Sequence, residues 1–363
     1  SLDFIEAVEK LAEINHVEIP RTATKQGPDN SKFFEINKLV ANEYFAYLKN
    51  EPVSVEYLKK RGLTGETAKV FGIGFAPNDY NTLKNQLNQY QESDMLSVGL
   101  LANSDNENYV KFRNRIMFPI LNFRSETIAY GGRALEDFGP KYLNSSDSVL
   151  YKKNRNLYFT KEFISSVKKK GYAILVEGYF DVLSLNQLGY SNSASPSGTA
   201  LTIQQLEAIS RYTNKILLCF DNDEAGLKAT ERVLEIKNQV SNKLEIHCLN
   251  LREKYKDISE LYEDDEDIFS GILKDNLEII EFLIDKFILN TSDKKNIFNY
   301  FMKITSNLSP LEVDVSLDLL SSKLNTAKDI LKKELRFQTS DEKNDVTEQT
   351  ISSISIFKDL IIA

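Results

Sequence analysis

The chain has 363 residues, 42% of them hydrophobic, which is enough to bury the cores of two or three domains. Its two Cys and two His lack the spacing of a zinc site, so zinc is not expected. No stretch reaches the roughly 20 apolar residues of a membrane span, and residues 1–4 lack the charged start of a signal peptide. These features predict a cytoplasmic protein that makes no contact with a membrane.

Charge is unevenly distributed along the chain. A net charge of −8 argues against a protein that simply coats nucleic acid, yet residues 111–170 contain 13 Lys and Arg against 5 Asp and Glu. A basic stretch in an acidic chain favours a local polyanion site. The alternative is ordinary charge fluctuation in a chain with 27% charged residues.

Apolar residues recur at helical spacing in the first quarter of the chain. The helices predicted there cover residues 2–14, 33–49, 55–61, 64 to 72 or 74, and 80–91, and residues 22–32 form a polar linker.

Three short strands are predicted next, at residues 110–112, 116–121 and 127–130. If the chain is extended through Lys111, Arg113 and Arg115, these cations share one strand face and form a track for phosphates. The alternative is an edge strand that is protected from aggregation by its charge.

A basic helix at residues 161–170 precedes a regular alternation of strands and helices. Such an alternation predicts a compact parallel sheet with helical crossovers. The predicted strands are 172–177, 191–195, 215–220 and 244–250, and the helices between them are 181–189, 202–212 and 224–239.

The expected fold class is mixed α+β and α/β, with a parallel α/β sheet at its centre. We predict an N-terminal α/β subdomain over residues 1–170, a central sheet subdomain over 171–255, a helical subdomain over 256–338, and a flexible linker or tail over 339–363.

Carboxylates follow two of the predicted strands directly. Glu177 and Asp181 come after the first strand, and Asp221 and Asp223 after the third. Because ligands bind beyond the carboxyl ends of parallel strands, we expect these four acids to meet around Mg²⁺ or Mn²⁺. For Asp181 alone the alternative is a helix N-cap, and for the Asp-x-Asp pair it is a solvated turn.

The motifs together resemble a known family. A strand ending in Glu-Gly and a strand ending in Asp-x-Asp are similar to the Toprim domain of bacterial primases, topoisomerases and nucleases. The upstream segments resemble the polymerase domain of DnaG-type primases. The matching segments, in chain order, are Tyr57–Leu63, Ile73–Pro77, Phe112–Ile120, Tyr130–Arg133, Pro140–Ser145, Val176–Asp181 and Phe220–Gly226.

The resemblance implies synthesis of short RNA primers on single-stranded DNA from ribonucleoside triphosphates. Glu177 is then the central metal ligand or general base, and Asp221 and Asp223 hold the metals with help from Asp181. Asp257 matches the first acid of a family Asp-Pro-Asp motif that reads Asp-Ile-Ser in this chain. The implied nucleotide- and DNA-binding surface contains Arg61, Arg113, Arg115, Arg133, Lys141, Tyr142, Asn144 and Lys152, where Lys153 is an equally good match for Lys152.

Two parts of the family do not fit within these residues: an N-terminal zinc domain and a C-terminal domain that binds the replicative helicase. We therefore expect a catalytic core. The alternatives are a Toprim nuclease or topoisomerase fragment, and a scaffold that binds template without catalysis.

Overall fold

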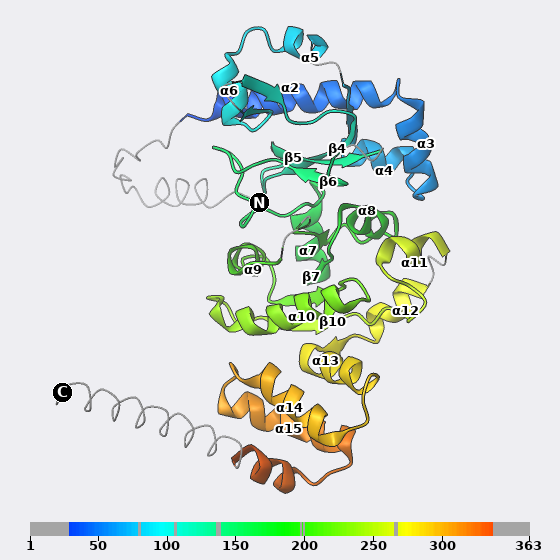
Figure 1. Ribbon diagram of the computed structural model, residues 1–363, viewed down its shortest axis with the longest axis vertical. Coiled ribbons are helices and arrows are strands. Elements are labelled where there is room, and N and C mark those ends of the chain that lie inside the picture. Colours follow the sequence, from blue (N-terminus) through cyan, green and yellow to red (C-terminus); the bar gives the residue numbers. More distant parts are fainter. Residues whose placement is uncertain are drawn as a thin grey trace, which may run out of the picture.

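A computed structural model of the chain describes residues 29–78, 81–104, 107–135, 139–196, 198, 200–264 and 268–336 (Figure 1). The helix predicted at 2–14 and the tail at 339–363 lie outside these residues. The described helices include none with the length and apolar character needed to cross a bilayer.

Helices build the start of the described chain, as predicted. They are α2 (Ser31–Leu48), α3 (Pro52–Lys60), α4 (Gly65–Val70), α5 (Asn81–Gln86) and α6 (Glu92–Ser97). Thr64 caps α4 by accepting a hydrogen bond from the backbone N–H of Thr67. The helix predicted at 80–91 is shorter than expected, because α5 ends at Gln86, and α6 was not predicted.

A four-stranded antiparallel sheet follows, with strand order β1-β4-β5-β6. Its strands are β1 (Gly74–Ala76), β4 (Arg115–Leu121), β5 (Thr127–Ala134) and β6 (Tyr142–Asn144), and a separate hairpin joins β2 (Leu101–Ser104) to β3 (Glu107–Val110). Side chains on β4 alternate between two cores: Ile116 and Phe118 face one, while Met117 faces α2.

The strand predicted at 110–112 is wrong. Strand β3 ends at Val110, and the chain turns before β4 at Asn114, whose φ is +55°. Lys111, Arg113 and Arg115 therefore do not share a strand face. Lys111 is half-buried, Arg113 is exposed, and Arg115 is buried.

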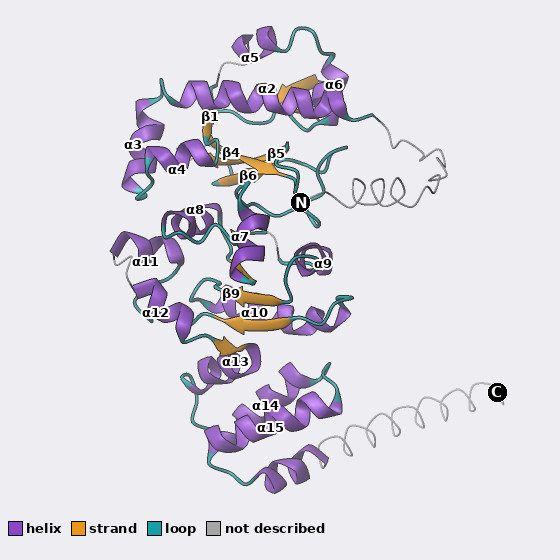
Figure 2. Ribbon diagram, turned by 180° about the vertical axis from the view of Figure 1, so that it is seen from behind, coloured by secondary structure: helices purple, strands orange, loops and turns teal. Residues whose placement is uncertain are grey.

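The predicted parallel α/β unit is confirmed as a five-stranded sheet with the order β11-β10-β9-β7-β8. Four strands are parallel, and β11 pairs antiparallel with β10 at the edge. The strands are β7 (Tyr172–Leu175), β8 (Ser193–Ala194), β9 (Lys215–Leu218), β10 (Glu245–Cys248) and β11 (Leu277–Glu278). Figure 2 shows the two sheets as separate groups of strands along the long axis.

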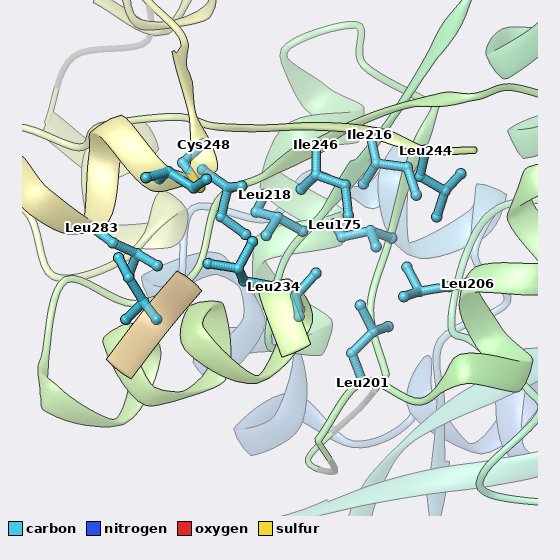
Figure 3. Close-up of a cluster of buried hydrophobic side chains, with 14 of the residues drawn as sticks. Leu175, Leu201, Leu206, Ile216, Leu218, Leu234, Leu244, Ile246, Cys248 and Leu283 are labelled. Carbon is cyan, nitrogen blue, oxygen red and sulfur yellow. The ribbon is translucent and has the colours of Figure 1, made fainter. Parts of the chain in front are cut away.

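Helices cover both faces of this sheet, which is why its central strands β7 and β9 consist mostly of buried apolar residues. Leu175 and Leu218 face a core shared with α7, α9, α10 and α13 (Figure 3), while Ile174 and Leu217 face one shared with α8, α11 and α12. The helices are α7 (Phe163–Lys170), α8 (Tyr179–Gln187), α9 (Ile203–Ser210), α10 (Glu224–Ile236), the 3₁₀ turn η1 (Lys237–Gln239), α11 (Ile258–Asp264), α12 (Phe269–Lys274) and α13 (Ile279–Ile288).

The C-terminal part is helical, as expected, apart from the unpredicted edge strand β11. Helices α14 (Lys294–Thr305) and α15 (Pro310–Leu324) pack with α13 through the same core that lies under the parallel sheet. The core that contains Ile174 and Leu217 likewise joins the antiparallel sheet to α8. The subdomain boundaries at 170 and 255 stay predictions, since hydrophobic contacts run across both.

Candidate active site

Glu177 and Asp221 lie side by side at the carboxyl ends of two neighbouring strands. Strands β7 and β9 pair in register at Leu175 and Leu218, so the loops that follow them leave the sheet together. The backbone N–H of Asp221 donates a hydrogen bond of 3.0 Å to Oε1 of Glu177. Burial raises the pKa of Glu177, and this hydrogen bond opposes the rise.

The turn after Glu177 contains Gly178, where a side chain would be crowded although the backbone angles are ordinary. The chain bends at Glu177 and Gly178 before α8 begins, and Gly178 has φ −117° and ψ 169°, an extended conformation that any residue adopts. A Cβ at this position would lie 3.0 Å from Oδ2 of Asp181. Ser195, which follows β8, also fixes the loop by donating a hydrogen bond of 2.6 Å to the carbonyl oxygen of Glu177.

Asp181 is buried beneath this turn. Its Oδ2 accepts a hydrogen bond from the backbone N–H of Gly178 (3.0 Å), and its Oδ1 accepts one from Ser259 (3.3 Å). Burial, followed by the negative charge of Asp257, raises the pKa of Asp181 to about 7. Asp181 is thus not the N-cap that was weighed for it: Gly178 is the N-cap of α8, and Asp181, in the first turn, accepts the hydrogen bond of the N-cap backbone on a carboxyl group that is costly to ionise.

The two aspartates of the Asp-x-Asp pair, Asp221 and Asp223, have different surroundings. Asp223 is the N-cap of α10, and its Oδ1 accepts hydrogen bonds of 3.0 Å from Ala225 and Gly226. Asp221 is more enclosed, and burial together with the charges of Asp181 and Glu177 raises its pKa to about 7. A Cβ on Gly226 would collide with the carbonyl oxygen of Asp221, so glycine lets α10 start directly against the acidic loop.

Asp257 and Lys256 approach the cluster from the loop before α11. Oδ1 of Asp257 accepts a hydrogen bond of 2.8 Å from the backbone N–H of Glu260. The ammonium Nζ of Lys256 lies 3.6 Å from Oδ2 of Asp223 and 4.0 Å from Oδ2 of Asp221. Lys256 had not been predicted as a site residue.

The donor set suits a hard divalent cation, because it consists of carboxylate oxygens whose mutual repulsion a cation relieves. Burial first, and the charges of the neighbouring acids second, raise the pKa of Asp181 and of Asp221 to about 7. Across the described ranges, however, no three acidic, His or Cys side chains are arranged so that they could hold an ion.

Arg133 is the centre of a cationic and aromatic cluster opposite the acids. Its guanidinium carbon lies 5.0 Å from the ring centres of both Tyr57 and Tyr142 and 5.7 Å from that of Phe180. Its Nη1 donates a hydrogen bond of 2.7 Å to the Tyr142 hydroxyl. Arg61 stacks on Phe180 at 4.9 Å. These rings hold the guanidinium groups in fixed orientations.

One cleft of about 1170 Å³ connects the acids with this cluster. The predicted site residues that line it are Arg61, Arg133, Lys141, Tyr142, Asn144, Glu177, Asp181, Asp221 and Asp257.

Asp223 lies at the rim of the cleft beside Lys256, and three predicted cations lie away from it. Arg115 is 4% exposed, and its Nη1 donates a hydrogen bond of 2.8 Å to the carbonyl oxygen of Pro140, so it supports the loop before Lys141. Lys152 pairs with Asp147 at 3.7 Å. Arg113 is exposed outside the cleft lining.

Between Lys152 and Lys153, which the sequence left open, Lys153 is the one that lines the cleft. Sequence reasoning missed other residues in the cleft and next to it. Tyr179, the first residue of α8, donates a hydrogen bond of 2.6 Å to Oδ1 of Asn144 on β6 and so links the antiparallel sheet to α8. Lys286 of α13 donates one of 2.8 Å to Oδ1 of Asn222, between the two aspartates. For Tyr179 and Asn222 the only sequence signal was adjacency, because each stands beside a residue that had been singled out.

Known proteins resemble the two parts of this chain whose residues line the cleft. Residues 44–164 match the family described as the N-terminal domain of the DNA primase catalytic core, and residues 174–262 match the Toprim-like family. A DNA primase of Haemophilus influenzae is 37% identical over 245 residues, which is 64% of this chain and 41% of the relative.

Two solved structures have the same fold. A DNA primase domain from Pseudomonas aeruginosa has a TM-score of 0.70 and 31% identity, covering 83% of this chain and 98% of that one. A DnaG primase catalytic domain bound to single-stranded DNA has a TM-score of 0.68 and 25% identity, covering 82% and 97%. Among the curated primases, the matches span between 37% and 56% of the relative's length.

Proposed function

The chain belongs to the family of bacterial DnaG-type DNA primases, and on this basis we propose that it synthesises short RNA primers on a single-stranded DNA template. The observation that carries the proposal is the shared cleft. Strand-terminal acids form one side of it, and the Arg133 cluster forms the other. Joining nucleotides needs both a site for phosphoryl chemistry and a cationic surface for template and triphosphate.

The proposed reaction is nucleotidyl transfer. The 3′-hydroxyl oxygen of the growing primer attacks the α-phosphorus of a ribonucleoside triphosphate, and the bond to pyrophosphate breaks. Glu177 takes the hydroxyl proton, a role that its raised pKa favours. The proton leaves the oxygen as the new P–O bond forms, so charge and atoms balance.

The acidic residues have a second proposed role as metal ligands. Glu177, Asp221 and Asp223 would hold Mg²⁺ or Mn²⁺, with Asp181 and Asp257 nearby. Bound there, such ions neutralise charge on the attacking and leaving oxygens, as two-metal sites do. The hydrogen bond from Asp221 to Glu177 keeps the two strand ends together for this purpose.

The basic residues are proposed to bind the polyanions. Arg61, Arg133, Lys141 and Lys153 contact phosphates, and the rings of Tyr142 and Phe180 offer faces on which a base can stack. The primase that was solved with single-stranded DNA supports the choice of template. The replicative helicase is a proposed partner, by way of a domain separate from this catalytic core.

An incorporation assay tests the function directly. Purified protein is incubated with single-stranded DNA, Mg²⁺ and labelled ribonucleotides, and the products are sized on a gel. We expect RNA of short length that requires template and disappears in Asp221→Asn. DNA cleavage without RNA product would favour the nuclease or topoisomerase alternative. Template binding that leaves ribonucleotides unused would favour the scaffold.

A further inference from the structure

Lys256 is the cation that contacts the Asp-x-Asp pair. Its ammonium lies 3.6 Å from Asp223 and 4.0 Å from Asp221, and its side chain is 59% exposed at the edge of the cleft. It has no helix of its own to hold it, since α11 begins two residues later at Ile258. The acids therefore hold the lysine by charge.

Several elements around Lys256 contribute negative charge. Glu177 comes from the end of β7, Asp181 from α8, Asp221 and Asp223 from the β9–α10 loop, and Asp257 from the loop before α11. Lys286 of α13 is also close, but its ammonium is bonded to the amide oxygen of Asn222. Lys256 is thus the cation that the described residues place against these carboxylates.

The main chain holds Lys256 next to the pair. The carbonyl oxygen of Lys256 accepts a hydrogen bond of 2.7 Å from the backbone N–H of Asn222, the residue between Asp221 and Asp223. This hydrogen bond ties the segment that carries Lys256 to the loop that carries Asp221 and Asp223. The flexible side chain of Lys256 can still move away from the two acids without breaking that backbone contact.

We propose that Lys256 is the resident counter-ion of this acidic cluster, and that a divalent cation binds Asp221 and Asp223 by displacing its ammonium group. The inference rests on the proposed function, in which these acids bind metal. It also accounts for the position of the Asp221 and Asp223 carboxylates, which both lie within 4.0 Å of one ammonium group. Displacement makes the apparent metal affinity weaker than the carboxylates alone would give.

Calorimetric titration with Mn²⁺ tests the competition. We expect Lys256→Met to lower the apparent Kd for Mn²⁺ by about three- to tenfold at low salt, a modest factor because the lysine is exposed and screened. Lys256→Arg keeps the charge and stays close to the parent. The difference between parent and Lys256→Met should shrink as KCl is raised.

Lys254→Met is the matched control. Lys254 stands two residues earlier in the same loop, but its ammonium pairs with Asp264 of α11 at 2.7 Å. The same loss of charge there should leave the Mn²⁺ affinity within about twofold of the parent, since Lys254 does not touch the Asp-x-Asp pair.

Thermal unfolding gives a second readout that is independent of activity. Without metal, Lys256→Met should unfold at a lower temperature than Lys254→Met, and saturating Mn²⁺ should remove the difference. Equal Mn²⁺ affinity in parent and Lys256→Met would overturn the inference and leave the proposed function standing. Absence of Mn²⁺ binding in every variant, together with no primer synthesis, would overturn both.

Discussion

The backbone N–H of Asp221 donates a hydrogen bond to Oε1 of Glu177 across 3.0 Å, although 44 residues separate them in the chain. Two neighbouring strand ends are thereby joined by one of the side chains proposed to act on substrate. The Glu177 carboxylate keeps its other oxygen free of this bond, which leaves it able to contact a further partner. The first prediction concerns this residue.

Replacing Glu177 with Gln should lower template-dependent ribonucleotide incorporation by at least about a hundredfold, because the amide cannot take a proton. The amide oxygen can still accept the hydrogen bond from Asp221, so the unfolding temperature should stay near that of the parent. Glu245→Gln is the control and should retain full activity, because Glu245 is the first residue of β10 and lies at the amino ends of the parallel strands, away from the acids. Normal incorporation by Glu177→Gln would rule out its role.

Arg133→Lys should weaken binding of single-stranded DNA by about tenfold, because an ammonium cannot stack between the rings of Tyr57 and Tyr142. Fluorescence anisotropy with a labelled oligonucleotide measures the change. Arg113→Lys makes the same substitution outside the cleft lining and should bind as the parent does. Equal losses in both variants would place the DNA elsewhere.

Lys153→Ala should reduce DNA affinity and its salt dependence, whereas Lys152→Ala should change both little. Lys153 lines the cleft, and Lys152 is paired with Asp147. Removal of one phosphate contact should lower the slope of log K against log salt by about 0.7 to 1. A larger effect in Lys152→Ala would reverse this assignment.

The metal-free protein should lose stability as the pH rises from about 4 to about 7. In the folded state the pKa of both Asp181 and Asp221 is raised to about 7, from a usual value of 3.8. Over that window the folded protein holds protons that the unfolded chain has released, so the free energy of unfolding falls with increasing pH and levels off above 7.

Thermal unfolding in EDTA at several pH values measures this trend. Asp181→Asn should flatten it, and Mg²⁺ should stabilise the parent most above pH 7, where the carboxylates are ionised. A stabilisation by Mg²⁺ that is the same at pH 5 and pH 8 would contradict the proposed site.

Gly226→Ala should destabilise the protein by about 1–3 kcal/mol and lower incorporation as well, because the new methyl group collides with the carbonyl oxygen of Asp221. Denaturant unfolding and the incorporation assay together measure it. Gly271→Ala, in α12, meets no atom within 4 Å and should be neutral or slightly stabilising. Unchanged stability in Gly226→Ala would mean that the acidic loop shifts freely.

Local sequence patterns determined the acidic half of the cleft. The short apolar runs before Glu177 and Asp221 are strands that helices cover on both faces, and such strands must bring their carboxyl ends to one edge. The order of motifs also indicated the family. Periodicity could therefore predict the elements and where the acids stand along them.

Only the tertiary structure decided which cations meet those acids. Residues 111–115 look extended in sequence, but the positive φ of Asn114 ends the alternation, and Arg115 enters the core to hold Pro140. Lys152 and Lys153 differ by one position, and folding alone shows that Lys153 lines the cleft. Lys256 reaches Asp223 across 33 residues of chain. Such contacts depend on loop conformation and packing between distant segments, which no local pattern of residues encodes.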